Sequence, residues 1–257
     1  MTENAIRVLY VDDEPMLLEV TKLYIERDRT FAVDTLPSAK EALERLKTVQ
    51  YDAIVSDYQM PEMDGIGFLK QLKRSGNATP VIIFTGRGRE EVVIEALNSG
   101  ADFYLEKGGD PKAQFAELSN KVRYAVTRKR TEEALRESEE RLSTILNAVQ
   151  IGIVLVEEES HKIIQANPKA LELMGASEGE VTGSVCHKFI CPAEWGKCPV
   201  TDLGQVIKSS ERVLITRDGA KVPIIKTVVP AIIGTKKILV ESFIEITDRK
   251  KADEVQR

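Results

Sequence analysis

Three carboxylates, a hydroxyl and an ammonium group stand at the ends of short apolar runs in the first half of the chain: Asp12, Asp13, Asp57, Thr85 and Lys107. Carboxylates that lie together repel one another unless a cation lies among them. Mg²⁺ prefers oxygen ligands and keeps several waters, so few carboxylates are needed to hold it. A carboxylate can also attack phosphorus, while lysine supplies compact positive charge and threonine donates a hydrogen bond. The residue types therefore suit formation of an aspartyl phosphate.

The elements that must position these groups follow from the hydrophobic pattern. Apolar runs rich in branched residues alternate with helical stretches, at residues 6–11, 31–36, 52–57, 80–85 and 101–107. Ser38, with Glu41 three residues later, predicts a capping box for the second helix. This alternation predicts an α/β domain with a doubly wound parallel sheet that is buried on both faces. Because function in such sheets lies at the carboxyl ends of the strands, we expect the five groups to face one crevice.

Four motifs in order, LYVDDEP, IVSDYQMPEMDG, IIFTGRG and DFYLEKG, resemble the receiver domain of response regulators. The resemblance covers roughly residues 5–125 and rests on separated motifs, which is a stronger signal than any single one. It implies a five-stranded, flavodoxin-like sheet. It also implies a Mg²⁺ site formed by Asp12, Asp13, Asp57 and the backbone carbonyl of Gln59.

The same resemblance assigns roles in phosphorylation. It implies that a histidine kinase donates a phosphoryl group to Asp57, with Thr85 and Lys107 taking part, and that Thr85 and Tyr104 reorient as the switch. We expect no separate enzymatic activity beyond this self-phosphorylation and autodephosphorylation. Family members usually carry proline after the lysine, whereas this chain has Gly108. We therefore expect a looser or differently shaped loop after Lys107.

The second half changes to the pattern of an α+β domain with an antiparallel sheet. Asp218-Gly219 is a turn signal between two apolar runs. The segments SEERLSTILNAVQIGIVLVE, IIQANPKALELMG, TRDGAKVPI and FIEITDRKKADE resemble a PAS sensor domain. That resemblance implies a sheet flanked by helices that binds a small ligand of unknown identity or serves in dimerisation. The expected divisions are a receiver domain at 1–125, a helical connector at 126–147 and a PAS domain at 148–250.

The connector carries a short apolar seam. Leu135, Leu142 and Val149 recur every seven residues, with Ile145 between them. About two heptads are too few to form a convincing coiled coil alone. Two interpretations stay open: the helix pairs with a second copy to give a homodimer, or it packs on its own domain.

The three cysteines lie close together, and a histidine is adjacent to the first: Cys186, His187, Cys191 and Cys198. Three thiolates and an imidazole form a chemically complete set for zinc, and an iron–sulfur cluster is an alternative. The spacing differs from the tight Cys-x₂-Cys knuckle of well-known zinc sites. Reversible thiol oxidation and inert buried cysteines are the other interpretations, so the sequence leaves a metal or redox sensor open.

The composition and the visible motifs limit which partners and which cell compartment we expect. The 257 residues carry a net charge of −5, without a basic stripe, which argues against nucleic-acid binding. No signal peptide or long apolar run is visible, so we expect a cytoplasmic protein that does not enter a membrane. No output enzyme or DNA-reading motif is visible, so we expect relay through protein–protein contacts of the PAS domain. The alternative is a fragment of a longer receiver–PAS histidine kinase.

Overall fold

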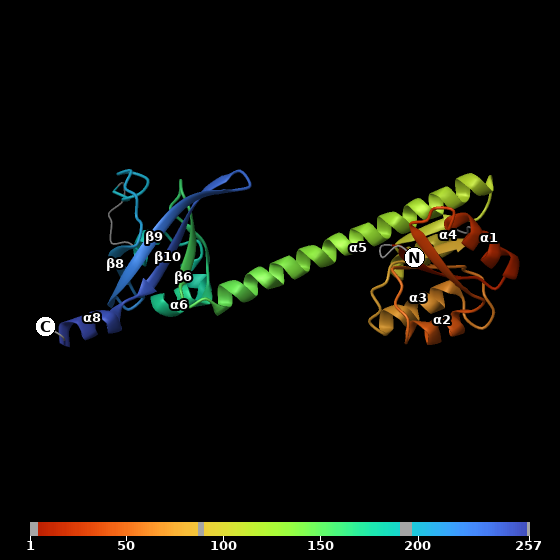
Figure 1. Cartoon of the computed structure of the whole chain (residues 1–257), viewed down its shortest axis with the longest axis horizontal. Helices are drawn as coiled ribbons and strands as arrows, with labels where there is room; N and C mark the ends of the chain where they lie inside the picture. Colours follow the sequence, from red (N-terminus) through yellow and green to blue (C-terminus); the bar gives the residue numbers. More distant parts are fainter. Residues whose placement is uncertain (1–4, 87–89, 191–196, 256–257) are drawn as a thin grey trace. The chain divides into compact units, whose positions relative to one another are not determined.

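The computed structural model describes residues 5–86, 90–190 and 197–255, and the chain divides into two compact units, Met1–Arg136 and Glu137–Arg257 (Figure 1). The elements of the first unit, in chain order, are β1 (Ile6–Val11), α1 (Pro15–Ile25), β2 (Phe31–Leu36), α2 (Ala39–Leu46), β3 (Ala53–Ser56), α3 (Gly65–Arg74), β4 (Val81–Thr85), α4 (Glu90–Asn98), β5 (Phe103–Glu106) and the beginning of α5 (Pro111–Ala148).

The first unit is built on a parallel sheet with the strand order β2-β1-β3-β4-β5. One face packs against α2, α3 and α4, through side chains that include Leu9, Ile54 and Ile83. The other face packs against α1 and α5, through side chains that include Val8 and Val55. The prediction of a five-stranded doubly wound parallel sheet is therefore confirmed.

Local capping explains where two of these helices begin. The Ser38 hydroxyl accepts a hydrogen bond from the Glu41 N–H at 3.3 Å, before the first turn of α2. The Glu41 carboxylate contacts that hydroxyl at 3.2 Å. Before α3, the Asp64 carboxylate accepts the Gly67 N–H at 2.6 Å. Each cap satisfies a backbone donor that has no partner within the helix.

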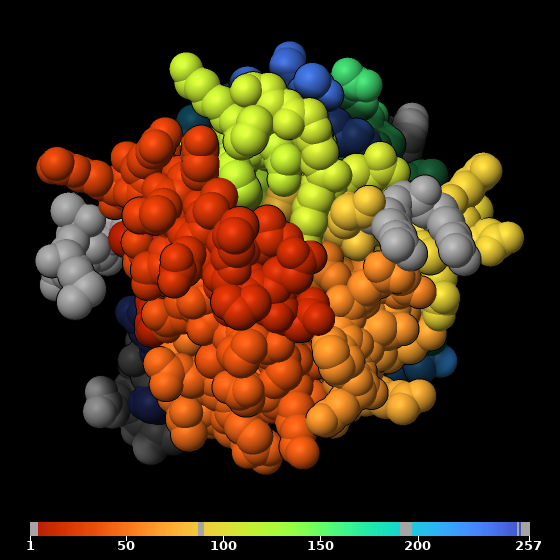
Figure 2. Space-filling view, turned by 90° about the vertical axis from the view of Figure 1, so that its right-hand side faces the viewer, coloured from red at the N-terminus to blue at the C-terminus, as the bar shows by residue number. Residues whose placement is uncertain are grey.

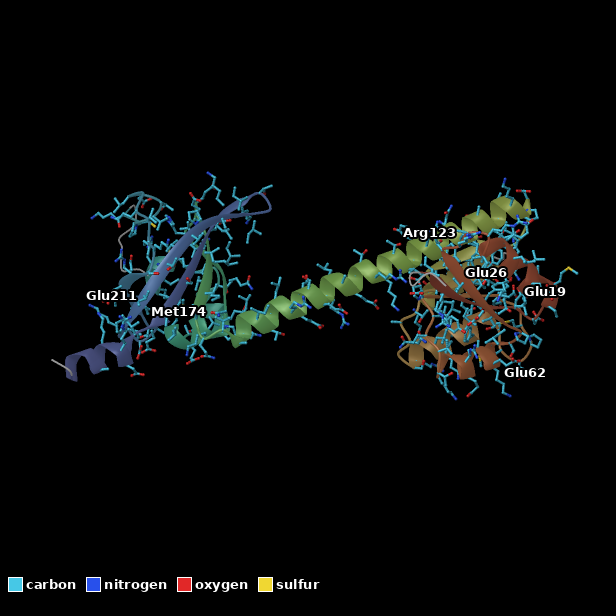
Figure 3. All side chains as sticks on the ribbon, viewed as in Figure 1. Glu19, Glu26, Glu62, Arg123, Met174 and Glu211 are labelled. Carbon is cyan, nitrogen blue, oxygen red and sulfur yellow. The ribbon has the colours of Figure 1, made fainter. Side chains whose placement is uncertain are left out.

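Helix α5 is continuous through the segment expected to be the connector. Asp110 accepts the Ala113 N–H at 2.9 Å before its first turn. Tyr24 of α1 stacks on Phe115 with ring centroids 4.8 Å apart, and Figure 2 shows these helices as adjacent red and yellow-green surfaces. Three α5 arginines, the first of them labelled in Figure 3, form ion pairs with aspartates near the amino ends of strands: Arg123 with Asp28, Arg128 with Asp102, and Arg130 with Asp52.

The second unit contains an antiparallel sheet with the strand order β7-β6-β10-β9-β8. Its elements after α5 are β6 (Gly152–Glu157), β7 (Ile163–Ala166), α6 (Pro168–Met174), α7 (Glu178–Val181), the 3₁₀ turn η1 (Cys186–Lys188), β8 (Ser210–Ile215), β9 (Lys221–Ile233), β10 (Lys236–Glu245) and α8 (Thr247–Val255). The core lies on one face of this sheet, against α6 and η1. The predicted α+β domain with an antiparallel sheet is confirmed.

Gly219, in the expected turn between β8 and β9, has φ of 82°, which favours glycine. Within the described residues, no helix combines the length and apolar character that crossing a membrane requires.

Candidate functional site

Asp57 follows β3 and is only 5% exposed. Its N–H donates to the Val11 carbonyl at 2.8 Å, which ties it to the end of β1. Its Oδ2 accepts the Gln59 N–H and its Oδ1 accepts the Lys107 ammonium, both at 2.6 Å. Burial raises the pKa of the Asp57 carboxyl, and the Lys107 charge opposes that rise. The carboxylate is therefore held in place but poorly solvated.

Lys107 joins two of the predicted carboxylates. Its Nζ lies 2.6 Å from Asp12 Oδ2 and 2.6 Å from Asp57 Oδ1. Its N–H donates to the Thr85 carbonyl at 2.7 Å, so β4 and β5 position the lysine backbone. The structure thus brings together groups that the sequence places far apart, because parallel strands end at the same edge.

The loop after Lys107 is attached to the first turns of α5. The Gly108 N–H donates to Gln114 Oε1 at 3.0 Å, a bond that proline could not make because it has no N–H. Gly109 has φ of 79°, a left-handed conformation that glycine adopts at no steric cost. The two glycines therefore give this loop a hydrogen bond and a backbone shape of its own.

Asp12 is fully buried and accepts three hydrogen bonds. Its Oδ1 accepts the Glu14 N–H at 3.0 Å, and its Oδ2 accepts from both Lys107 and the Tyr10 hydroxyl, the latter at 2.5 Å. Burial, and then the Asp12 charge, raise the pKa of Tyr10, so the phenol stays protonated and acts as donor. Sequence reasoning missed Tyr10; the available signal was one hydroxyl-bearing aromatic in the otherwise aliphatic end of the run at 6–11.

The other two predicted metal ligands lie at the surface. Asp13 and Gln59 are exposed and line one depression of about 440 Å³, together with Asp64. Within the described residues, no set of three or more His, Cys, Asp or Glu side chains is arranged to hold a metal ion. The predicted Mg²⁺ site therefore has oxygen donors at a surface depression, beside carboxylates that already accept hydrogen bonds.

The predicted switch residues lie on the neighbouring strands β4 and β5. Thr85 is buried at the end of β4. Tyr104 of β5 is half-buried, and its partner across the ladder is Ile83. Burial raises the pKa of Tyr104, with the Glu106 and Asp57 charges adding to the rise. Tyr104 is thus electrostatically linked to the candidate acceptor.

Gly65 is a second residue that sequence reasoning missed. Its N–H donates to the Tyr58 carbonyl at 2.8 Å, and a Cβ at this position would lie 2.2 Å from the Asp57 carbonyl oxygen. Only glycine permits this approach, so the backbone at Asp57 rests directly on the start of α3. The available signal was the Asp64-Gly65 pair that closes the IVSDYQMPEMDG motif.

The predicted cysteine site is described only in part. Cys186 and Cys198 are buried, whereas Cys191 lies outside the described residues. Among the described residues, the His187 ring nitrogens are buried without a hydrogen-bond partner, and the ring centroid lies 5.4 Å from that of His161. Burial lowers the pKa of His187. A metal or redox role at these residues therefore stays a prediction.

An ion pair that sequence reasoning missed lies in the core of the second unit. Lys226 of β9 and Glu241 of β10 are almost fully buried, with Nζ 2.8 Å from Oε2, at an angle outside that of an ordinary hydrogen bond. Strand register places both on the face that carries Val154 and Phe243. Two charges thus stand among apolar side chains.

Comparisons with known proteins match both halves. A family model described as a response regulator receiver domain matches residues 8–119, and a PAS domain model matches residues 150–248. SrrA of Staphylococcus aureus (strain NCTC 8325 / PS 47), a transcriptional regulatory protein, is 30% identical over 173 residues, which cover 65% of this chain and 68% of SrrA. ResD of Bacillus subtilis (strain 168), also a transcriptional regulatory protein, is 33% identical over 109 residues.

The match to ResD covers 42% of this chain and 45% of ResD, so the chain spans less than half the length of that relative. Among solved structures, the receiver domain of the Francisella response regulator 1452 is 35% identical, covers 48% of this chain and 98% of its own, and has a TM-score of 0.45.

Proposed function

The chain belongs to the response regulators of two-component signalling, with a receiver domain followed by a PAS domain, and from that premise we propose that Asp57 accepts a phosphoryl group from a histidine kinase. The observation that carries the proposal is the Lys107 ammonium, which lies 2.6 Å from both Asp12 and Asp57. A buried carboxylate fixed beside a compact positive charge suits an in-line attack on phosphorus.

The transfer step needs no other nucleophile from the chain. A carboxylate oxygen of Asp57 forms a bond to phosphorus while the bond from phosphorus to the kinase histidine nitrogen breaks. The electron pair of that bond leaves with the imidazole. Lys107 offsets charge on the transferred oxygens, and the Thr85 hydroxyl donates a hydrogen bond to the new group. Hydrolysis of this aspartyl phosphate returns the resting state, and we assign no turnover of a separate substrate.

The oxygen-rich donor set fits Mg²⁺. The Asp57 carboxylate, with Asp13 and the Gln59 carbonyl at the adjoining depression, would hold the ion, while Asp12 adds a third negative charge. When bound, Mg²⁺ would offset charge on the transferred phosphoryl oxygens. Asp12, Asp13 and Asp57 place three carboxylates at one sheet edge, beside the single ammonium group of Lys107. A bound cation would offset the remaining negative charge, and this supports the assignment.

The signal would leave through the switch residues and α5. A phosphoryl group at Asp57 adds charge and acceptor oxygens, which draws in Thr85 and releases Tyr104 to reorient. Helix α5 packs on the receiver sheet through Leu118 and Val122, so a change at β5 reaches the helix by direct packing. We propose that the PAS domain then passes the change on through protein–protein contacts in the cytoplasm.

The outer face of the PAS sheet supports a contact role. Register puts Ile225, Val229 and Ile244 on the face opposite the core, and Val229 and Ile244 are 53% and 45% exposed.

On α5, the seam residues Leu142 and Ile145 are 59% and 53% exposed. These apolar side chains are exposed to solvent, and their burial against a second copy of the helix would be favourable. We therefore propose a homodimer through this seam.

Native mass spectrometry of the whole chain, before and after Mg²⁺ plus acetyl phosphate, tests the acceptor. We expect one added phosphoryl group in the wild type and none in Asp57→Asn. Asp34→Asn is the matched control, since Asp34 also accepts a tyrosine hydroxyl, at 2.7 Å, and its side chain pairs with Arg7 and Arg45. Phosphorylation of the Asp57 variant at normal stoichiometry would contradict the proposal.

The dimer is tested separately by sedimentation of the wild type and of Leu142→Glu/Ile145→Glu. The charged pair should shift the chain towards monomer, because two carboxylates would then be placed in an apolar seam. Val206→Glu is a control, since Val206 is also exposed but lies in the segment before β8 and not on α5. A variant that sediments like the wild type would exclude this seam as the interface.

A further inference from the structure

Tyr10 is a fully buried residue of β1 whose side chain points towards α1 and α5. The other buried members of that cluster, including Val8, Val55 and Phe84, are apolar, and a phenylalanine ring would fill nearly the same space. The hydroxyl is therefore the part of Tyr10 that packing does not explain. That hydroxyl lies 2.5 Å from Asp12 Oδ2.

The hydroxyl bonds to the same carboxylate oxygen that contacts Lys107. Asp12 Oδ2 accepts from Tyr10 on one side and from the Lys107 ammonium, at 2.6 Å, on the other. The second oxygen of Asp12 accepts the Glu14 N–H. The three donors fix the orientation of the carboxylate and disperse its negative charge.

The Lys107 ammonium is divided between two competing acceptors. It lies 2.6 Å from Asp12 Oδ2 and 2.6 Å from Asp57 Oδ1. A donor that weakens Asp12 as an acceptor leaves more of the lysine charge at Asp57. Without the Tyr10 hydroxyl, the ammonium would move towards Asp12. Asp57 would then keep more of its negative charge and would attract a nearby cation more strongly.

From this geometry we propose that Tyr10 is a positioning residue for phosphorylation: its hydroxyl holds Asp12 so that Lys107 remains shared with Asp57, and the lysine charge at Asp57 then limits the attraction of Mg²⁺. The inference rests on the proposed phosphorylation of Asp57 and deepens it. The Tyr10 hydroxyl donates to Asp12, so its effect on Asp57 passes mainly through that carboxylate.

The test compares Tyr10→Phe with the wild type in the whole chain, with two measurements. The first is the Mg²⁺ dissociation constant, from amide shifts in a ¹H–¹⁵N NMR titration with MgCl₂. The second is the rate of phosphorylation by acetyl phosphate at saturating Mg²⁺. Tyr51→Phe is the matched control, because it also removes a tyrosine hydroxyl that donates to an aspartate, Asp34, away from this site.

We expect Tyr10→Phe to bind Mg²⁺ about three- to tenfold more tightly and to be phosphorylated about three- to tenfold more slowly. These changes are smaller than the full effect of one hydrogen bond to a charged group, because Tyr10 acts through Asp12. Tyr51→Phe should match the wild type in both measurements. The opposite directions of the two changes are the signature, since a packing defect would weaken binding and slow the reaction together.

Either unchanged values in Tyr10→Phe or weaker binding with a slower reaction would overturn the positioning role. A wild type that shows no Mg²⁺-dependent shift would overturn it as well. A wild type that binds Mg²⁺ but accepts no phosphoryl group would refute the proposed function, while the comparison of dissociation constants would still decide whether Tyr10 acts on Asp12.

Discussion

Asn167, the N-cap of α6, donates through Nδ2 to the carbonyl oxygen of Leu146 in the last turn of α5, at 3.1 Å. The same amide donates to the Ile151 carbonyl at 2.9 Å, and its oxygen accepts the N–H groups of Ile153 and Ala170. One buried side chain thus joins the end of α5, the start of β6 and the first turn of α6. A movement of α5 would reach the PAS sheet through this residue.

Replacement of Asn167 should therefore weaken the PAS domain. We expect Asn167→Ala to lower its free energy of unfolding by about 2–4 kcal/mol, because several buried backbone groups lose their partner at once. Urea unfolding followed by the fluorescence of the single tryptophan, which the sequence places in the PAS segment, measures the change. Asn147→Ala, which removes one long exposed contact on α5, is the control and should behave like the wild type. Equal losses in both variants would contradict this role for Asn167.

The buried Lys226–Glu241 pair predicts a non-additive pattern. Glu241→Leu alone should cost about 3–5 kcal/mol, because it leaves the Lys226 ammonium buried without a countercharge. The double variant Lys226→Met/Glu241→Leu should recover most of that loss, since both charges are then replaced by apolar groups. Urea unfolding of the single and double variants gives the coupling directly.

The exposed Glu211–Lys250 pair provides a control for that cycle; Figure 3 labels Glu211. Glu211→Gln should leave stability unchanged within error, because water screens both partners. Additive losses at Lys226 and Glu241 would mean that the two charges do not depend on one another.

The environment of His187 predicts a pH dependence for the PAS domain. Burial and the His161 charge lower the pKa of His187, and Lys226 adds to this, whereas Asp202 and Glu241 oppose it. Above the ordinary histidine pKa near 6.5, the imidazole is neutral in both the folded and the unfolded chain. As the pH falls below that value, only the unfolded chain gains the proton, so stability falls until the pH passes below the folded pKa. Unfolding at pH 7.5 and 5.5 should show this loss in the wild type and a smaller loss in His187→Gln. A loss of the same size in the variant would assign the dependence to other groups.

The sequence was sufficient for the fold and for the groups that gather at the strand ends. Asp12, Asp57 and Lys107 lie together because parallel strands end at the same edge of the sheet. The hydrophobic pattern of the sequence already predicts that sheet. Hydrophobic periodicity says less about which charged side chains are buried in the core. Lys226 and Glu241 lie in strands where a charged residue is normally expected to face water, and only the register of β9 against β10 places them inside. The role of the Tyr10 hydroxyl is also difficult to predict from the sequence, because it depends on a hydrogen bond to Asp12, just beyond the end of β1.

Gly65 illustrates another limit of sequence reasoning, since its importance depends on a distance between backbones. An added Cβ would lie 2.2 Å from the Asp57 carbonyl oxygen, so either α3 or the end of β3 must shift. Gly65→Ala should therefore destabilise the receiver domain by about 2–4 kcal/mol and slow phosphorylation of Asp57, because the acceptor backbone moves. Gly179→Ala is the matched control, because its Cβ would meet no atom within 4 Å. Thermal unfolding and acetyl phosphate labelling of both variants test the two effects. If Gly65→Ala retained wild-type stability and labelling, the close approach of α3 to Asp57 would not be needed for the site.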